Sequence, residues 1–172
     1  MAKNRADILT ELIIKHHCQR IAEVGIRKGK TVSQVLSNTQ ANDVITEYWG
    51  IEISSKWYIY AARYMYFFPQ FRLLHMSSEE AAAFFTSLST ISSKASKGGY
   101  FDLIFIDANH RYFYAKQDLL FWEPLLKQGG IFAGHDYYNG VNPRHPGVKK
   151  AVDEIIGPEN IRVLPDVMWV RK

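Results

Sequence analysis

The sequence predicts one α/β domain, in which a parallel sheet is doubly wound with helices on both faces. Apolar and amphipathic segments alternate from residue 20 to residue 135, as expected for strands joined by right-handed helical crossovers. Segment 101–106 (FDLIFI) is almost continuously apolar, which is typical of a central parallel strand. Near the start of the chain, an apolar run is followed by two glycines and an amphipathic segment, the pattern that opens a nucleotide-type βαβ unit.

The composition agrees with a single globular domain over residues 1–172. Apolar residues make up 47% and charged residues 22%, and no apolar run approaches the about 20 residues needed to cross a bilayer. The charged N-terminus lacks a cleavage site, so we expect no signal peptide and no membrane partner. A lone cysteine, Cys18, indicates a packed thiol in a reducing compartment, hence a cytoplasmic protein. The net charge of +4 is spread along the chain, which does not favour a nucleic-acid partner.

The first predicted elements are a helix, a strand and a second helix. Apolar residues recur on one side of residues 1–18, which predicts an N-terminal amphipathic helix. Residues 20–24 form the first predicted strand, and residues 31–37 form the helix that follows it. Gly25, between the two, allows a sharp turn and a close approach to a ligand because it has no Cβ.

The middle of the chain continues the alternation. Residues 43–52 are predicted to be the second strand, which ends in an acid. A helix is expected over residues 55–68, closed by Pro69, and a short third strand over residues 71–74. A serine then caps a helix over residues 78–88.

After the strand at 101–106, the pattern predicts three further elements and a hairpin. A long helix places apolar residues on one face over residues 115–126, and Gly129-Gly130 is expected to stop it. Residues 131–133 are the fifth strand, and residues 148–156 form another helix. Two apolar runs within residues 161–170 flank a Pro-Asp turn and predict a closing antiparallel hairpin.

Polar residues and glycines follow five successive predicted strands. Ligands of open α/β sheets bind outside the carboxyl ends of the strands, so these residues are the functional candidates. They are Glu23, Gly25, Glu52, Ser77, Ser78, Asp107, His135 and Asp136. Any one of the acids alone also fits a helix cap or a solvated carboxylate.

Several segments together resemble the class I S-adenosyl-L-methionine (SAM) dependent methyltransferases. Within that class the chain is most similar to the small O-methyltransferase-like family, grouped with cephalosporin hydroxylases and with macrolide and aminocoumarin sugar O-methyltransferases. The segments that carry this resemblance are Glu23–Gly29, Gly50–Glu52, Phe101–His110, Pro124–Gly130, Gly134–Tyr137 and Pro146–Val152.

The resemblance implies a Rossmann-like sheet of seven strands, the last antiparallel, and SAM as the cofactor. It implies that the loop containing Gly25 and Gly29 packs against the methionine part of SAM, and that Glu23 pairs with its amino group. Glu52, followed by Ile53, would accept hydrogen bonds from the ribose hydroxyls, since a carboxylate has two oxygens for this purpose.

The resemblance also assigns the adenine and methyl ends of the cofactor. Met76, Ser77 and Ser78 would border the adenine, although members of the family usually carry an aspartate where this chain has Ser77. Asp107 would face the reacting methyl group. Ala108 replaces a more common glycine beside it.

A divalent cation is the open question of the implied site. In metal-dependent relatives the positions that match Asp107, His135 and Asp136 hold an ion that lowers the pKa of the acceptor hydroxyl. Two carboxylates and an imidazole suit Mg²⁺ or Mn²⁺, but His135 stands where several metal-dependent members carry an acid. Without a metal, His110 or His135 is the expected general base.

Three functions compete on these residues. The first is SAM-dependent O-methylation of a small hydroxylated metabolite, with the loop 137–146 covering the acceptor. The second is a SAM-binding scaffold that has lost catalysis. The third is a nicotinamide-dependent dehydrogenase, which is disfavoured because Arg27 stands where its fingerprint needs a glycine.

The aromatic residues between Trp57 and Phe71 exceed what one helix face can bury. Such a surplus predicts an apolar surface patch, which on a small domain often contacts another subunit. We therefore expect a homodimer or a higher homo-oligomer.

Overall fold

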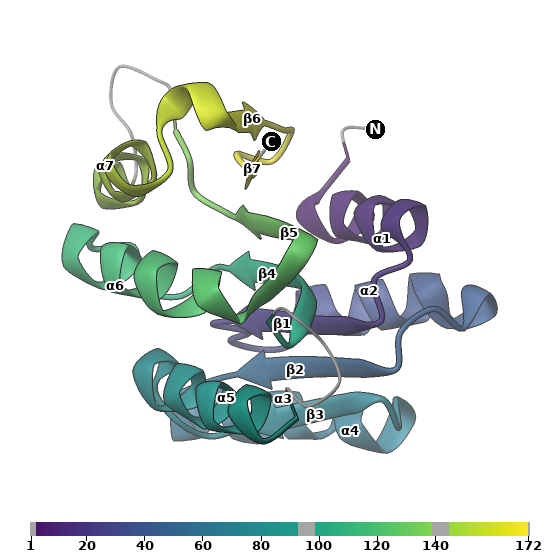
Figure 1. The fold of residues 1–172 in the computed structure, drawn as a ribbon. Helices are drawn as coiled ribbons and strands as arrows, with labels where there is room; N and C mark the ends of the chain where they lie inside the picture. Colours follow the sequence, from purple (N-terminus) through teal and green to yellow (C-terminus); the bar gives the residue numbers. More distant parts are fainter. Residues whose placement is uncertain (1–2, 93–98, 139–144, 172) are drawn as a thin grey trace.

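The computed structural model describes residues 3–92, 99–138 and 145–171, in which one seven-stranded sheet lies between two layers of helices (Figure 1). The strands are β1 (Arg20–Val24), β2 (Glu47–Ile51), β3 (Phe71–Leu74), β4 (Phe101–Ile106), β5 (Leu126–Gly134), β6 (Ile161–Val163) and β7 (Trp169–Arg171). The helices are α1 (Arg5–His16), α2 (Lys30–Thr39), α3 (Ser55–Ala62), α4 (Tyr64–Phe67), α5 (Ser78–Ser92), α6 (Tyr112–Trp122) and α7 (Pro146–Ile155).

The strands are ordered β3-β2-β1-β4-β5-β7-β6. Strands β1 to β5 pair in parallel, whereas β7 runs antiparallel to both β5 and β6. The predicted Rossmann-like sheet of seven strands with an antiparallel last strand is therefore confirmed. The strand order reverses between β1 and β4, and in such sheets ligands bind at the carboxyl ends of the strands beside this switch.

The sheet separates two apolar cores. Helices α1, α2 and α3 cover one face and α5, α6 and α7 cover the other, as predicted. In the central strand β4, Leu103 and Phe105 contribute to the first core, and Ile104 and Ile106 to the second. This alternation buries β4 on both sides and explains why its sequence is continuously apolar.

The second strand is shorter than predicted. Residues 43–46 lie outside β2, which begins at Glu47. Asp43 has a left-handed backbone (φ 45°) after the 3₁₀ turn η1 (Gln40–Asn42), and a strand cannot continue through that conformation. Ile45 is nevertheless buried in the first core. Its apolar character therefore reflects packing of the connection and not sheet pairing.

The predicted long helix over residues 115–126 also ends early. Helix α6 stops at Trp122, and the 3₁₀ turn η2 (Glu123–Leu125) contains Pro124. Leu126 is the first residue of β5, so Gly129 and Gly130 lie inside a strand and do not stop a helix. Pro124 explains the early end of α6, because proline has no N–H to continue the helical hydrogen bonds.

The segment over residues 55–68 is not one helix. It divides into α3 and the single turn α4, and only Ala61 within them is buried. Ile59, Tyr66 and Phe67 are 71%, 87% and 65% exposed, so the predicted apolar surplus does reach the surface. None of the helices within the described ranges has the length and apolar character that a bilayer crossing requires.

Candidate functional site

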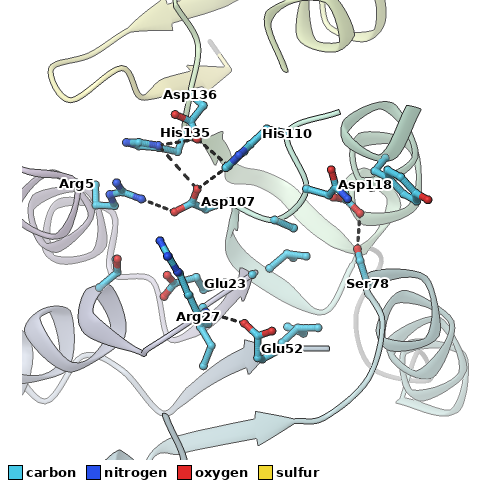
Figure 2. Close-up of a pocket in the computed structure, with 18 of the residues that line it drawn as sticks. Arg5, Glu23, Arg27, Glu52, Ser78, Asp107, His110, Asp118, His135 and Asp136 are labelled. Carbon is cyan, nitrogen blue, oxygen red and sulfur yellow. Dashed lines mark hydrogen bonds and ion pairs between the residues drawn. The ribbon is translucent and has the colours of Figure 1, made fainter. Parts of the chain in front are cut away.

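The carboxyl ends of β1, β2, β4 and β5 open into one cavity of about 1290 Å³. Drug-sized ligands usually occupy pockets of about 300 to 1,000 Å³, so this cavity has room for more than one small molecule. Side chains from the N-terminal helix α1 and from the strand ends surround it (Figure 2). Asp166 and Val167 of the β6–β7 turn also line it.

Glu23, the penultimate residue of β1, lies at the base of the cavity and is 1% exposed. The hydroxyl of Tyr48 donates a hydrogen bond of 2.7 Å to its carboxylate. Burial, only partly opposed by this hydrogen bond, raises the pKa of Glu23 to about 8. Glu23 is therefore largely protonated at neutral pH, and a nearby cationic group of a ligand would favour its ionisation.

Gly25 forms the turn after β1 with φ of 91°. A Cβ at this position would lie 2.5 Å from the backbone of Asp107 and of Ala108, so glycine is required by the neighbouring strand end as well as by the turn. Gly29, the other predicted cofactor residue of this loop, is buried against Tyr64 and does not line the cavity.

Glu52 follows β2 and is 7% exposed. One of its oxygens accepts a hydrogen bond from the backbone N–H of Arg27 (2.8 Å), and the other accepts one from that of Ser54 (2.7 Å). Each carboxylate oxygen has a second lone pair that remains for a ligand hydroxyl. Glu52 thus ties the glycine loop to the start of α3, while Ile53 beside it lines the cavity and is 68% exposed.

Met76, Ser77 and Ser78, the residues expected to border the adenine, line the cavity after β3. The Ser77 hydroxyl accepts a hydrogen bond from the backbone N–H of Glu80, whose carboxylate accepts in return from the backbone of Ser77. Ser77 therefore caps the N-terminus of α5. This capping role is a sufficient reason for a serine at position 77, and no contact with a ligand is needed to explain it.

Ser78 contacts an acid that the sequence did not single out. Its hydroxyl donates to Asp118 (2.5 Å) and accepts from the indole N–H of Trp122 (2.8 Å). Asp118 lies on α6, is 5% exposed and lines the cavity. Burial raises the pKa of Asp118 to about 6. A buried carboxylate at a cavity wall is a candidate hydrogen-bond acceptor for a ligand.

Asp107, His110, His135 and Asp136 meet at the ends of β4 and β5 (Figure 2). His110 Nε2 lies 2.8 Å from an oxygen of Asp136, and His135 Nδ1 lies 3.2 Å from the same oxygen. Asp107 Oδ1 lies 3.7 Å from His110 Nε2 and 3.8 Å from His135 Nδ1. The structure therefore brings together four side chains that the sequence analysis named from separate segments.

The charges of this cluster are strongly coupled. The carboxylates of Asp107 and Asp136 raise the pKa of His110 to about 9. Burial acts to raise the pKa of Asp136, but His110 and His135 outweigh it, so this pKa lies well below its usual range. At neutral pH the cluster therefore contains an imidazolium beside an ionised carboxylate.

The ring nitrogens of the two histidines point to a ligand. Within the described ranges, both nitrogens of His135 and Nε2 of His110 are buried without a well-aligned hydrogen bond, despite their nearby carboxylates. Ligand atoms of Asp107, His135 and Asp136 lie within 4.8 Å of one another, and a second such group is His110, Asp136 and His145. Both groups have the composition and spacing of a divalent-cation site.

Two residues missed by the sequence analysis complete the cavity. The guanidinium of Arg5, on α1, forms an ion pair with Asp107. The backbone N–H of Arg5 donates a hydrogen bond of 2.8 Å to Asp166, and Asp166 lies 3.7 Å from His135 Nε2. Asp166 and Val167 both have positive φ, 55° and 48°, in the β6–β7 turn. No sequence signal near residue 107 indicates these partners.

The predicted cover of the acceptor, loop 137–146, lies largely outside the described residues, which exclude 139–144. Tyr138 and His145, on either side of that gap, both line the cavity. Tyr137 is anchored by its hydroxyl, which donates a hydrogen bond of 2.6 Å to Asp153 of α7.

Comparisons with known proteins agree with this geometry. The family model described as "Methyltransferase domain" matches residues 22–137, which run from within β1 to beyond the end of β5. Among curated proteins, no significant match to the sequence is found.

Solved structures share the fold at low sequence identity. An O-methyltransferase from Bacillus cereus, solved with S-adenosylhomocysteine (SAH), is 16% identical with a TM-score of 0.69, and the match covers 98% of this chain and 80% of that one. The O-methyltransferase TomG of tomaymycin synthesis from Streptomyces achromogenes, solved with SAM, is 12% identical with a TM-score of 0.68. That match covers 97% of this chain and 78% of TomG. CalS11, a TDP-rhamnose 3′-O-methyltransferase of calicheamicin biosynthesis, is 15% identical with a TM-score of 0.68. That match covers 98% of this chain and 81% of CalS11.

Proposed function

The chain belongs to the methyltransferase domain family of SAM-dependent enzymes, and we propose that it transfers the methyl group of SAM to a hydroxyl oxygen of a small molecule. The observation that carries this proposal is the convergence of Glu23, Glu52 and Asp107 on one cavity at the carboxyl ends of β1, β2 and β4. Structural neighbours that are O-methyltransferases support oxygen as the acceptor atom. Membership of the methyltransferase domain family excludes the alternative that the chain is a nicotinamide-dependent dehydrogenase.

The proposed cofactor pose follows the order of the strand ends. The amino group of SAM lies against Glu23, whose ionisation it favours, and the ribose hydroxyls donate to Glu52. Adenine extends toward Met76 and Ser78. Ile53 provides apolar contact beside the ribose.

Asp118 is proposed to read the adenine amino group. The aspartate that performs this task in similar sequences is replaced by Ser77, which instead caps α5. Asp118 lines the same wall as Ser78 and has only one of its oxygens bonded to that serine in the described structure. Its other oxygen can accept a hydrogen bond from an amino group.

The transfer itself is an in-line displacement. A lone pair of the acceptor oxygen forms the new O–CH₃ bond while the C–S bond breaks, and the sulfonium becomes the neutral thioether of SAH. We propose that His135 takes the hydroxyl proton, because its buried ring nitrogens lack aligned partners in the described ranges. His110, protonated at neutral pH, stabilises the developing oxyanion, and Asp107 orients both imidazoles.

A divalent cation fits the same cluster. Asp107, His135 and Asp136 would hold it, since their ligand atoms are close together and the histidine nitrogens lack aligned hydrogen bonds within the described ranges. When bound, an ion such as Mg²⁺ or Mn²⁺ lowers the pKa of a coordinated hydroxyl. The guanidinium of Arg5 already pairs with one carboxylate oxygen of Asp107. A divalent cation would therefore compete with this guanidinium for the Asp107 carboxylate.

Self-association is a separate part of the proposal. Ile59, Tyr66 and Phe67 each expose a large apolar side chain on α3 or α4, and subunits often bury such side chains. Sedimentation at micromolar concentration tests it: a mass of two or more chains is expected, and a mass of one chain contradicts it. A cytoplasmic location stays a prediction.

The function is tested by two measurements on the purified chain. Calorimetric titration should show saturable binding of SAM and SAH, and labelled SAM should methylate at least one member of a panel of small hydroxylated compounds. Binding without transfer to any acceptor would favour the scaffold alternative. Absence of binding to both compounds would contradict the proposal as a whole.

A further inference from the structure

The fold gathers basic side chains that are scattered in the sequence. Arg27, Lys28 and Lys30 lie in and after the glycine loop, and Lys56 and Arg63 lie on and just after α3. The two segments are in contact, because a Cβ at Gly29 would lie 2.9 Å from the ring of Tyr64. We call these five basic residues the loop–α3 cluster. All five side chains belong to exposed residues.

Among the described residues, the loop–α3 cluster lacks an acidic partner. Within residues 3–92, 99–138 and 145–171, none of its five members forms an ion pair. The carboxylate of Glu52, beneath the same loop, is 7% exposed and accepts from the backbone of Arg27 and not from its guanidinium. The cluster therefore exposes a concentrated positive charge.

Three members of the cluster surround one indole ring. Lys56 Nζ lies 4.7 Å, Lys28 Nζ 5.1 Å and Arg27 Cζ 5.5 Å from the ring centroid of Trp57. Like charges held around one ring repel one another even in water. Cation–π attraction to Trp57 offsets part of this repulsion, and an anion placed among the three cations would remove it.

Three members of the cluster line the proposed active site. Arg27, Lys28 and Lys30 line the same cavity as Asp107, and Figure 2 shows Arg27 in the hollow that also contains Glu23 and Glu52. SAM brings a single carboxylate, which pairs with one or two of these cations at most. The remaining cations are available to a second anionic group in the same cavity.

We propose that the loop–α3 cluster binds the phosphate group of a phosphate-bearing acceptor. This inference rests on the proposed methyl transfer and specifies the class of its substrate. Arg27, Lys28 and Lys56 make charge-assisted hydrogen bonds to the phosphate oxygens in front of Trp57. The acceptor hydroxyl then extends toward Asp107 and the two histidines. A small molecule is favoured over RNA because three of the five cations line the catalytic cavity itself.

Inorganic pyrophosphate is the probe that tests the inference. It is titrated into the intact chain, with and without saturating SAH, at two salt concentrations. We expect saturable binding that weakens with salt and that becomes at least about tenfold weaker in the double variant Lys28→Gln/Lys56→Gln. The melting temperature of that variant should stay within about 2 °C of that of the natural chain, which shows that it is folded.

A matched control separates the cluster from net charge. Lys15→Gln/Lys150→Gln removes the same charge from α1 and α7, and it should bind pyrophosphate as the natural chain does. Absence of saturable pyrophosphate binding, or equal loss in both double variants, would overturn the inference. So would a short single-stranded RNA that binds through Lys28 and Lys56 about 100-fold more tightly. Failure of SAH to bind contradicts the methyl-transfer proposal instead, and the SAH-free titration still decides this inference.

Discussion

The guanidinium of Arg5, in the first turn of α1, forms an ion pair with Asp107 at the end of β4. The pair uses Oδ2 of Asp107, whereas Oδ1 faces His110 and His135. The N-terminal helix therefore supplies a fixed positive charge to the centre of the candidate site. This arrangement makes Arg5 a competitor of any divalent cation that Asp107 would hold.

Replacement of Arg5 by alanine should strengthen metal binding. Without the guanidinium, Asp107 has one charged partner fewer, so the affinity for Mn²⁺ should rise by about tenfold, which corresponds to about 1.4 kcal/mol. Titration of Mn²⁺ followed by electron paramagnetic resonance measures this directly. Lys3→Ala is the control, because Lys3 pairs with exposed Glu11 on the same helix. Unchanged or weaker Mn²⁺ binding in Arg5→Ala would refute the competition.

Glu23 should make the ligand-free protein less stable as the pH rises. Its pKa is about 8 in the folded protein, against an ordinary value of 4.5. Between these values the folded state holds a proton that the unfolded chain has lost. The free energy of unfolding therefore falls with rising pH, by at most about 1.4 kcal/mol per pH unit.

Thermal melts of Glu23→Gln between pH 5 and pH 8 test this assignment. The variant should show a flatter pH dependence than the natural chain across the whole range. In Asp118→Asn the flattening should be confined below about pH 6, where Asp118 titrates in the folded protein. The raised pKa of His110 also makes the free energy of unfolding fall with rising pH above about pH 6.5. Both variants retain His110 and therefore this contribution. An unaltered slope in Glu23→Gln would contradict the raised pKa.

Substitution of Glu52 should affect both SAM binding and stability. Glu52→Ala removes the acceptor for the ribose hydroxyls, and SAM should bind at least about tenfold more weakly, since hydrogen bonds to charged groups contribute about 1.5–3 kcal/mol. It also leaves the N–H groups of Arg27 and Ser54 without their acceptor, so the melting temperature should fall. Glu47→Ala is the matched control. Glu47 accepts from Tyr100 and Trp49 at the opposite end of β2, so its loss should lower stability alone. Equal SAM affinities in the two variants would exclude Glu52 from the cofactor site.

Val167 carries backbone strain that glycine would relieve. Its φ of 48° is left-handed, a conformation that β-branched residues rarely adopt. Val167→Gly should therefore stabilise the protein by about 1 kcal/mol, or raise the melting temperature by about 2–4 °C. Val163→Gly, in the adjacent strand β6, should instead lower it. A lower melting temperature for Val167→Gly would mean that side-chain packing outweighs the strain.

The strand ends could be predicted because parallel strands impose a pattern on the local sequence. An apolar run followed by Glu23, Glu52 or Asp107 marks both the strand and the edge where it ends. The error at residues 43–46 arose because Ile45 is buried without being paired in the sheet. Apolar character reports burial, and it does not distinguish a strand from a packed connection.

Arg5, Asp118 and Asp166 could not be predicted as site residues. Arg5 and Asp118 lie on helices whose sequences place them among ordinary polar positions, and Asp166 lies in a hairpin turn where aspartate is common. Only the packing of α1, α6 and the β6–β7 turn around the cavity brings them to it. The same holds for the loop–α3 cluster, whose cations are up to 36 positions apart in sequence, from Arg27 to Arg63.

A crystal structure of the chain with SAH tests the central claim most directly. The account predicts ribose hydroxyls within hydrogen-bond distance of Glu52, the amino group beside Glu23 and the sulfur facing Asp107. SAH bound away from these three carboxylates, in a chain that otherwise retains this fold, would contradict it.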